Sequence, residues 1–147
     1  MKRIFNLLLI AAAIAGMPAS AEAAPAVSLD SAVFVERATP GMGRMLEPAT
    51  ELSRGDRVVY VVRWYKLGGD GGFVVTNPLP RSVYYQGSAN GDEEVSTDGG
   101  RTWGKLAMLR SGDRPATPED VTHVRWRVDP RTASRGQGRI AYSAVVR

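Results

Sequence analysis

The chain of 147 residues carries 19 basic and 15 acidic side chains, no cysteine and a single histidine. Lacking cysteine, it has no disulfide framework, thiol nucleophile or thiolate metal site, and one histidine cannot supply a multi-histidine metal site. The basic residues are spread along the chain and form no stripe interleaved with stacking aromatics, which argues against nucleic-acid binding. We expect no cofactor.

The first 23 residues have the layout of a secretory signal peptide. Lys2 and Arg3 precede an uncharged, mostly apolar run over residues 4–16, and two small-residue cleavage patterns follow it. The run is shorter than the roughly 20 residues that a membrane-spanning helix needs. We therefore predict a signal peptide over residues 1–23 and an exported domain over residues 24–147, periplasmic or extracellular, soluble and not membrane-spanning. A buried N-terminal helix or an uncleaved anchor is the alternative.

Short alternating segments separated by glycine and proline fill the exported domain, as is typical of β-strands. The clearest covers residues 58–65 and has apolar side chains on both faces, which predicts a central strand covered on both sides over at least its first half. Residues 38–53 and 106–119 contain glycine and proline without a sustained period and are predicted to be loop. The other predicted strands cover residues 27–37, 73–76, 82–88, 123–128 and 140–146, and a hairpin over 93–103 turns at Asp98-Gly99-Gly100.

These seven or eight short strands, without a useful amphipathic helix or an internal repeat, predict an all-β fold. We expect an immunoglobulin-like antiparallel β-sandwich, in which Val124, Trp126 and Val128 face the core. A small barrel is the alternative.

The sharpest local motif is Ser96-Thr97-Asp98-Gly99-Gly100-Arg101-Thr102-Trp103, which fits the Asp-box pattern Ser-x-Asp-x-Gly-x-Thr-Trp. A carboxylate in such a turn accepts backbone N–H groups, and glycine supplies a backbone conformation that other residues adopt at a cost. Asp-boxes are familiar from sialidases, but those enzymes are much longer propellers with repeated boxes away from the active site. We interpret the single copy here as a turn that stabilises the fold, with a glycoside hydrolase as the less favoured alternative.

The candidate ligand-binding residues are His123, Arg125 and Arg127, which period-two spacing places on one face of a strand. They could form a cationic strip for an acidic glycan or a lipid headgroup. We favour an ordinary solvated face paired with Glu93, Glu94 or Asp120, because surface charge pairs are common and weak.

Other candidate sites are weaker. The carboxylate groups of residues 92–94 and 119–120 lie at loop–strand junctions, with no indication of a cleft. Five aromatic residues could form a sugar-stacking platform, although their place in alternating strands favours core packing. They are Trp64, Tyr84, Tyr85, Trp103 and Trp126. We assign no catalytic or metal-binding residue.

Several motifs together resemble a known family. They are Gly55-Asp56-x-Val58-x-Tyr60, Asn77-Pro78-Leu79-Pro80-x-x-Val83-x-Tyr85, Ser96-x-Asp98-Gly99-Gly100-x-Thr102-Trp103-Gly104, Asp120-Val121-Thr122-His123-Val124-Arg125-Trp126 and Gly136-x-Gly138-x-Ile140-x-Tyr142. In this order they are similar to the DUF11-type repeat domains of bacterial surface and secreted proteins, over most of residues 27–147. The resemblance implies an immunoglobulin-like sandwich, often in envelope proteins and without a known catalytic residue. The loops at residues 64–69 and 134–136 depart from the family pattern.

The function that we expect is therefore a non-catalytic structural or protein-interaction module of the bacterial cell envelope. Its partner would be another envelope protein or a surface polymer. A small carbohydrate-binding module is the alternative. An exposed row of aromatic rings would favour the carbohydrate module, and buried rings would favour the structural or interaction role.

Overall fold

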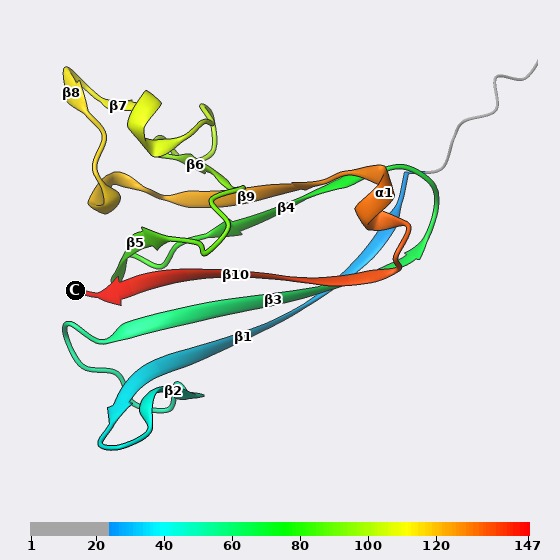
Figure 1. Ribbon diagram of the computed structural model, residues 1–147. Coiled ribbons are helices and arrows are strands. Elements are labelled where there is room, and N and C mark those ends of the chain that lie inside the picture. Colours follow the sequence, from blue (N-terminus) through cyan, green and yellow to red (C-terminus); the bar gives the residue numbers. More distant parts are fainter. Residues whose placement is uncertain (1–23) are drawn as a thin grey trace, which may run out of the picture.

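The computed structural model describes residues 24–147, so the signal peptide predicted over residues 1–23 lies outside the described residues. Two antiparallel sheets face each other across the core (Figure 1). In spatial order, the first sheet contains β2 (Gly43–Pro48), β1 (Ala26–Thr39), β3 (Arg57–Gly68), β10 (Gln137–Val146) and β5 (Val83–Gly87). The second contains β4 (Phe73–Pro78), β9 (His123–Val128) and β6 (Glu94–Ser96).

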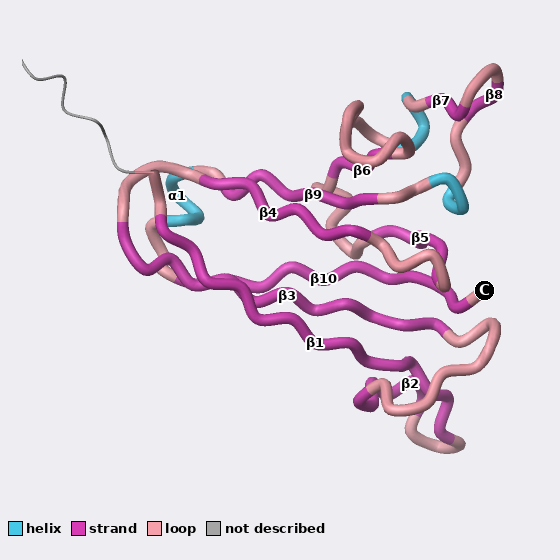
Figure 2. The backbone as a smooth tube through the Cα atoms, turned by 180° about the vertical axis from the view of Figure 1, so that it is seen from behind, coloured by secondary structure: helices cyan, strands magenta, loops and turns pink. Residues whose placement is uncertain are grey.

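The remaining elements are short. The pair β7 (Arg110–Ser111) and β8 (Arg114–Pro115) forms a small hairpin, and the 3-10 turns cover Leu106–Met108 and Pro118–Asp120. The one-turn helix α1 (Pro130–Ala133) joins β9 to β10 at one end of the sandwich, as Figure 2 shows from behind. Within the described residues, eight strands make up the two main sheets, which confirms the predicted all-β sandwich of antiparallel strands. No helix among residues 24–147 is long and apolar enough to cross a membrane.

The strand β3 lies at the centre of the first sheet, between β1 and β10, as its sequence predicts. Its inner face is buried through Val58, Val62 and Trp64. Its outer face is only half-buried at Val59 and Val61, so the prediction that both faces are covered holds for one face alone. A second layer, the three-stranded sheet, covers only the inner side.

The core lies between the facing sheets and is rich in aromatic residues. Val124, Trp126 and Val128 of β9 are buried as predicted, and they pack against Trp64 of β3 and Tyr142 of β10 in one cluster. Because side chains alternate along a strand, each strand contributes every second residue to this cluster.

Three predicted segments differ from the structure. Residues 106–119 were predicted to be loop, but the short strands β7 and β8 pair there. Residues 38–53 were predicted to be loop, but β2 forms there and pairs with β1 through a turn that uses positive φ at Gly41 and Gly43. All six residues of β2 are exposed, so its sequence carries no alternating pattern. The hairpin predicted over residues 93–103 is only partly formed, since β6 pairs with β9 and only the isolated pair Val95–Gly104 closes the turn.

The packing of Gly138 against Trp64 can be tested by the substitution Gly138→Ala, which adds one methyl group. A Cβ at Gly138 would lie 2.3 Å from Cζ2 of Trp64, whose ring has little room to move because the residue is 2% exposed. We predict that Gly138→Ala lowers the free energy of unfolding by about 1–3 kcal/mol, the usual cost of overpacking a core. The control is Gly68→Ala, where the added Cβ meets nothing within 4 Å. Equal urea midpoints for the two variants would contradict this packing.

Candidate functional site

The three candidate residues His123, Arg125 and Arg127 lie on β9 and share the outer face of the second sheet, because the residues that alternate with them are buried. Glu94 of β6 stands directly opposite Arg125. Its Oε2 accepts hydrogen bonds from Arg125 Nε at 2.7 Å and from Arg127 Nε at 3.3 Å. The hydrogen bond from Arg125 holds the pKa of Glu94 below its usual value. The structure therefore brings the strip together and neutralises part of its charge.

Trp103 of the Asp-box covers two members of the strip. The guanidinium carbon of Arg125 lies 4.4 Å from the centroid of the Trp103 ring, within the range of a cation–π contact. The ring of His123 meets Trp103 edge-on, with centroids 6.3 Å apart. The Arg125 side chain is consequently 18% exposed, whereas that of Arg127 is 64% exposed. Of the three, Arg127 alone keeps most of its side chain in solvent.

The Asp-box forms a turn whose polar groups bond to one another. Oδ1 of Asp98 accepts from the backbone N–H of Thr102 at 2.9 Å, from that of Arg101 at 3.0 Å and from the Ser96 hydroxyl at 2.8 Å. Nε1 of Trp103 donates to the carbonyl of Gly100 at 2.8 Å. The hydrogen bonds to Asp98, of which the one from the Thr102 N–H has the largest effect, hold the pKa of Asp98 far below its usual value. The carboxylate is thus engaged in holding the turn.

The neighbouring carboxylates of residues 92–94 do not converge on one site. Glu93 is buried, and its carboxylate accepts from the Ser88 N–H at 3.1 Å and from the Ser88 and Tyr85 hydroxyls. Burial opposes ionisation of Glu93, but these hydrogen bonds outweigh it and lower the pKa. Glu94 points outward to the arginines of β9, and Asp92 lines a cleft.

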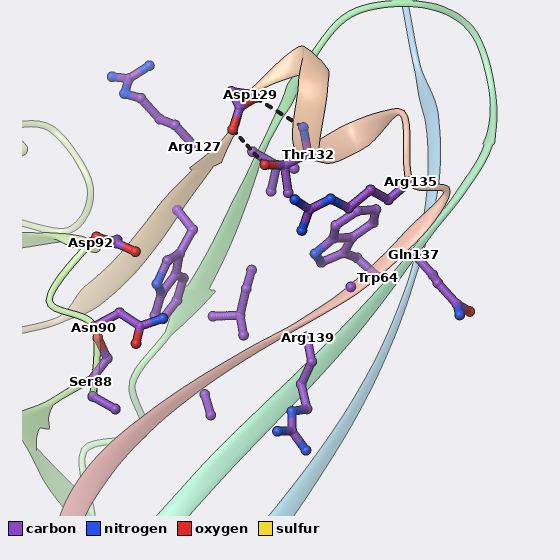
Figure 3. A pocket seen from close by; sticks show the side chains of 16 residues that line it. Trp64, Ser88, Asn90, Asp92, Arg127, Asp129, Thr132, Arg135, Gln137 and Arg139 are labelled. Carbon is purple, nitrogen blue, oxygen red and sulfur yellow. Dashed lines mark hydrogen bonds between the residues drawn. The ribbon is translucent and has the colours of Figure 1, made fainter.

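That cleft, of about 490 Å³, lies between the two sheets where their edge strands are too short to close the side of the sandwich. In the first sheet β5 pairs with β10 only over residues 143–146. In the second sheet β6 pairs with β9 only over residues 123–125. The first half of β10 and the end of β9 therefore have no neighbouring strand on this side among residues 24–147. The segment 88–92 borders the opening, and α1 stands near it (Figure 3).

Indole rings and charged side chains line the cleft. Trp64 and Trp126 contribute the rings, but these residues are only 2% and 8% exposed. The charged lining residues are Arg127, Arg135, Arg139, Asp92 and Asp129. Both oxygens of Asp129 accept hydrogen bonds from Thr132, at 3.0 Å from its N–H and at 2.7 Å from its hydroxyl, and so cap α1. The side-chain hydrogen bond from Thr132 and, after it, the backbone hydrogen bond lower the pKa of Asp129. Arg127 and Arg139 border the cleft from the outer faces of the two sheets.

The unpaired half of β10 presents backbone groups toward this side. The carbonyl of Gly136 accepts from Lys66 of β3, and the N–H of Val146 donates to Asp56. The register with β3 has no irregularity between these two bonds. Since backbone groups alternate sides along an antiparallel strand, the N–H and C=O groups of Arg139 and Ala141 point away from β3. Within the described residues no strand pairs with them there.

Sequence reasoning missed the cleft because its lining comes from separate segments of the chain, around residues 64, 88–92 and 126–141. No motif joins these segments. The predicted strands 82–88 and 140–146 are equally long, so the predicted strand lengths do not reveal the cleft either.

The Asp-box turn yields a prediction that separates a structural turn from an active site. Asp98→Ala should lower the melting temperature at about pH 7, because it removes three hydrogen bonds from the turn. The folded pKa is depressed, so the stabilisation is present above the unfolded pKa of about 4 and is lost as pH falls below it. The difference in melting temperature between wild type and Asp98→Ala should therefore become smaller at acid pH. An unchanged melting temperature with loss of a wild-type glycosidase signal would instead indicate catalysis.

The buried Glu93 can be compared with its half-buried neighbour Glu94. Glu93→Gln should lower the free energy of unfolding by about 1–3 kcal/mol, because the amide puts donors where Tyr85 and Ser88 already donate. The matched control, Glu94→Gln on the outer face, should cost less than about 1 kcal/mol. Denaturant titration measures both. If the two substitutions cost the same, the Glu93 network is not the stabilising contact that its burial indicates.

No family model, curated protein or solved structure matches this chain. The resemblance to DUF11-type domains therefore stays a prediction, and the geometry of the described residues has to carry the functional inference.

Proposed function

We propose that this chain is a non-catalytic protein-interaction module of the bacterial cell envelope, exported by the signal peptide predicted over residues 1–23. Its partner is another envelope protein. The unpaired edge of β10 beside the cleft is the observation that carries the proposal. Backbone N–H and C=O groups without a neighbour at a sheet edge are a template for a strand from another chain.

The contacts of the acidic side chains support a role without catalysis. Asp98 is engaged in the turn, Glu93 is buried beneath two hydroxyls and Glu94 is bonded to two arginines. A glycosidase needs one carboxyl group whose pKa is raised so that it can donate a proton. Asp129 in the cleft has a lowered pKa instead.

The aromatic residues favour a protein partner over a sugar. A stacking platform needs ring faces that are open to solvent, whereas Trp64, Trp126 and Tyr85 are buried in the core. Trp103 is covered by Arg125. Among residues 24–147, Tyr65 on β3 is the one exposed aromatic residue, and the half-buried Tyr84 lies beneath Arg147, whose guanidinium carbon is 5.8 Å from the ring centroid. This arrangement supports the interaction module over the carbohydrate-binding alternative.

The proposal is tested by photo-crosslinking in the bacterium that makes the chain. A photoreactive residue at Ala141 should trap one defined protein, whereas the same residue at Arg54, on the turn before β3, should not. The trapped protein should then bind the purified chain directly, and Ala141→Pro should abolish that binding. Crosslinks that are equal at the two positions, or a captured protein that binds Ala141→Pro as well as wild type, would contradict the proposal.

A further inference from the structure

We propose that the free edge of β10 binds an extended segment in which acidic and small apolar residues alternate, as an added antiparallel strand. This inference rests on the proposed function and names the chemistry of the partner segment. The open edge spans residues 137–141, which accommodates about five residues of an extended chain at roughly 3.3 Å each. All strand pairs within the two main sheets are antiparallel, and we expect the added strand to follow the same arrangement.

The outer face of the first sheet beside this edge is positively charged and favours an acidic side chain on the added strand. Arg139 is exposed and alternates with the buried Ile140, so it projects from the outer face of the first sheet. Arg63 of β3 stands directly opposite it, and like charges in opposite positions destabilise a strand pair. The nearest acid to Arg63 is Asp30, with Nη1 and Oδ2 4.0 Å apart. An acidic residue on the added strand opposite Arg139 would offset this repulsion.

The inner face beside the edge calls for small apolar side chains. Residues of an added strand that stand opposite Gly138 and Ile140 would point into the cleft. Gly138 contributes no side chain there, and the indoles of Trp64 and Trp126 line the space. Arg135, also in the lining, forms no salt bridge within residues 24–147 and adds positive charge at the opening (Figure 3).

The alternation of side chains and of backbone groups determines which residues of the added strand pair with β10 and which place their side chains in the cleft. The residues opposite Arg139 and Ala141 exchange N–H and C=O bonds with β10, and their side chains lie on the outer face with the arginines. These are the acidic positions. The residues between them turn their N–H groups away from β10 and their side chains into the cleft.

The probe is the peptide acetyl-Gly-Val-Asp-Val-Asp-Val-Gly-amide, titrated calorimetrically into the full chain purified after export. One control peptide carries Lys at both Asp positions, and a second has the same composition with its Val and Asp residues in separate blocks. The alternating acidic peptide should bind about tenfold or more tightly than either control. Equal binding of the three peptides would overturn the proposal.

Protein variants test the edge and the charge separately. Ala141→Pro removes an N–H that has no partner in the sheet, a change that edge positions tolerate, and should weaken binding about tenfold or more. Arg139→Glu should weaken binding of the acidic peptide and strengthen binding of the Lys peptide, whereas the matched Arg54→Glu should change neither affinity.

Methylation of the peptide nitrogens tests the backbone pairing without altering the protein. N-methyl groups on the Asp residues should abolish binding, and N-methyl groups on the Val residues should not.

The remaining outcomes identify other occupants. Binding of polygalacturonate that survives Ala141→Pro but not Arg139→Glu would indicate an anionic polymer in place of a strand. Self-association that Ala141→Pro abolishes would indicate a second copy of this chain. Either result would overturn the proposal that an acidic segment binds at this edge. If the partner trapped at Ala141 lacks an alternating acidic segment, this inference fails while the proposed function stands, and if nothing is trapped and no peptide binds, both fail.

Discussion

Tyr142 joins the two sheets at the centre of the molecule, in a chain that has no cysteine to link them covalently. It is 1% exposed, stacks on Tyr60 of β3 with centroids 4.9 Å apart, and lies 5.5 Å from the ring of Trp126 on β9. A buried hydroxyl is costly without a hydrogen bond, and Asn77 of β4 donates one to it. One side chain of β10 thus contacts β3, β4 and β9, and aromatic packing does what disulfides do in many exported domains.

The same strand creates the candidate site. β10 continues beyond the end of β5, and β9 continues beyond the end of β6, so the sandwich is closed around Tyr142 and open beside Gly138. The open part is not a defect of packing, because Trp64 and Trp126 remain buried next to it. The cleft therefore lies on a firm core, and its unpaired backbone belongs to a strand whose opposite edge is fully paired with β3.

The parts predicted from sequence are those in which residues close in the chain determine the outcome. Alternation in residues 58–65 and 123–128 places β3 and β9 and their buried faces, and the Asp-box bonds run within residues 96–103. The strand β2 was missed because none of its side chains is buried. The cleft was missed because it depends on where strands end relative to neighbours that lie far away in sequence. The partial neutralisation of Arg125 by Glu94 lay between these cases, as one of several pairings that the sequence allowed.

The position of β10 also bears on when this protein can fold. It follows every other strand of the two sheets in chain order, yet it lies between β3 and β5 and supplies Tyr142 to the core. Until β10 has been synthesised, β5 has no partner in its sheet and the aromatic cluster lacks its central ring. Contacts between segments so distant in sequence form slowly. A chain that cannot complete its core early stays unfolded for longer, and an unfolded chain is what the export predicted for residues 24–147 would require.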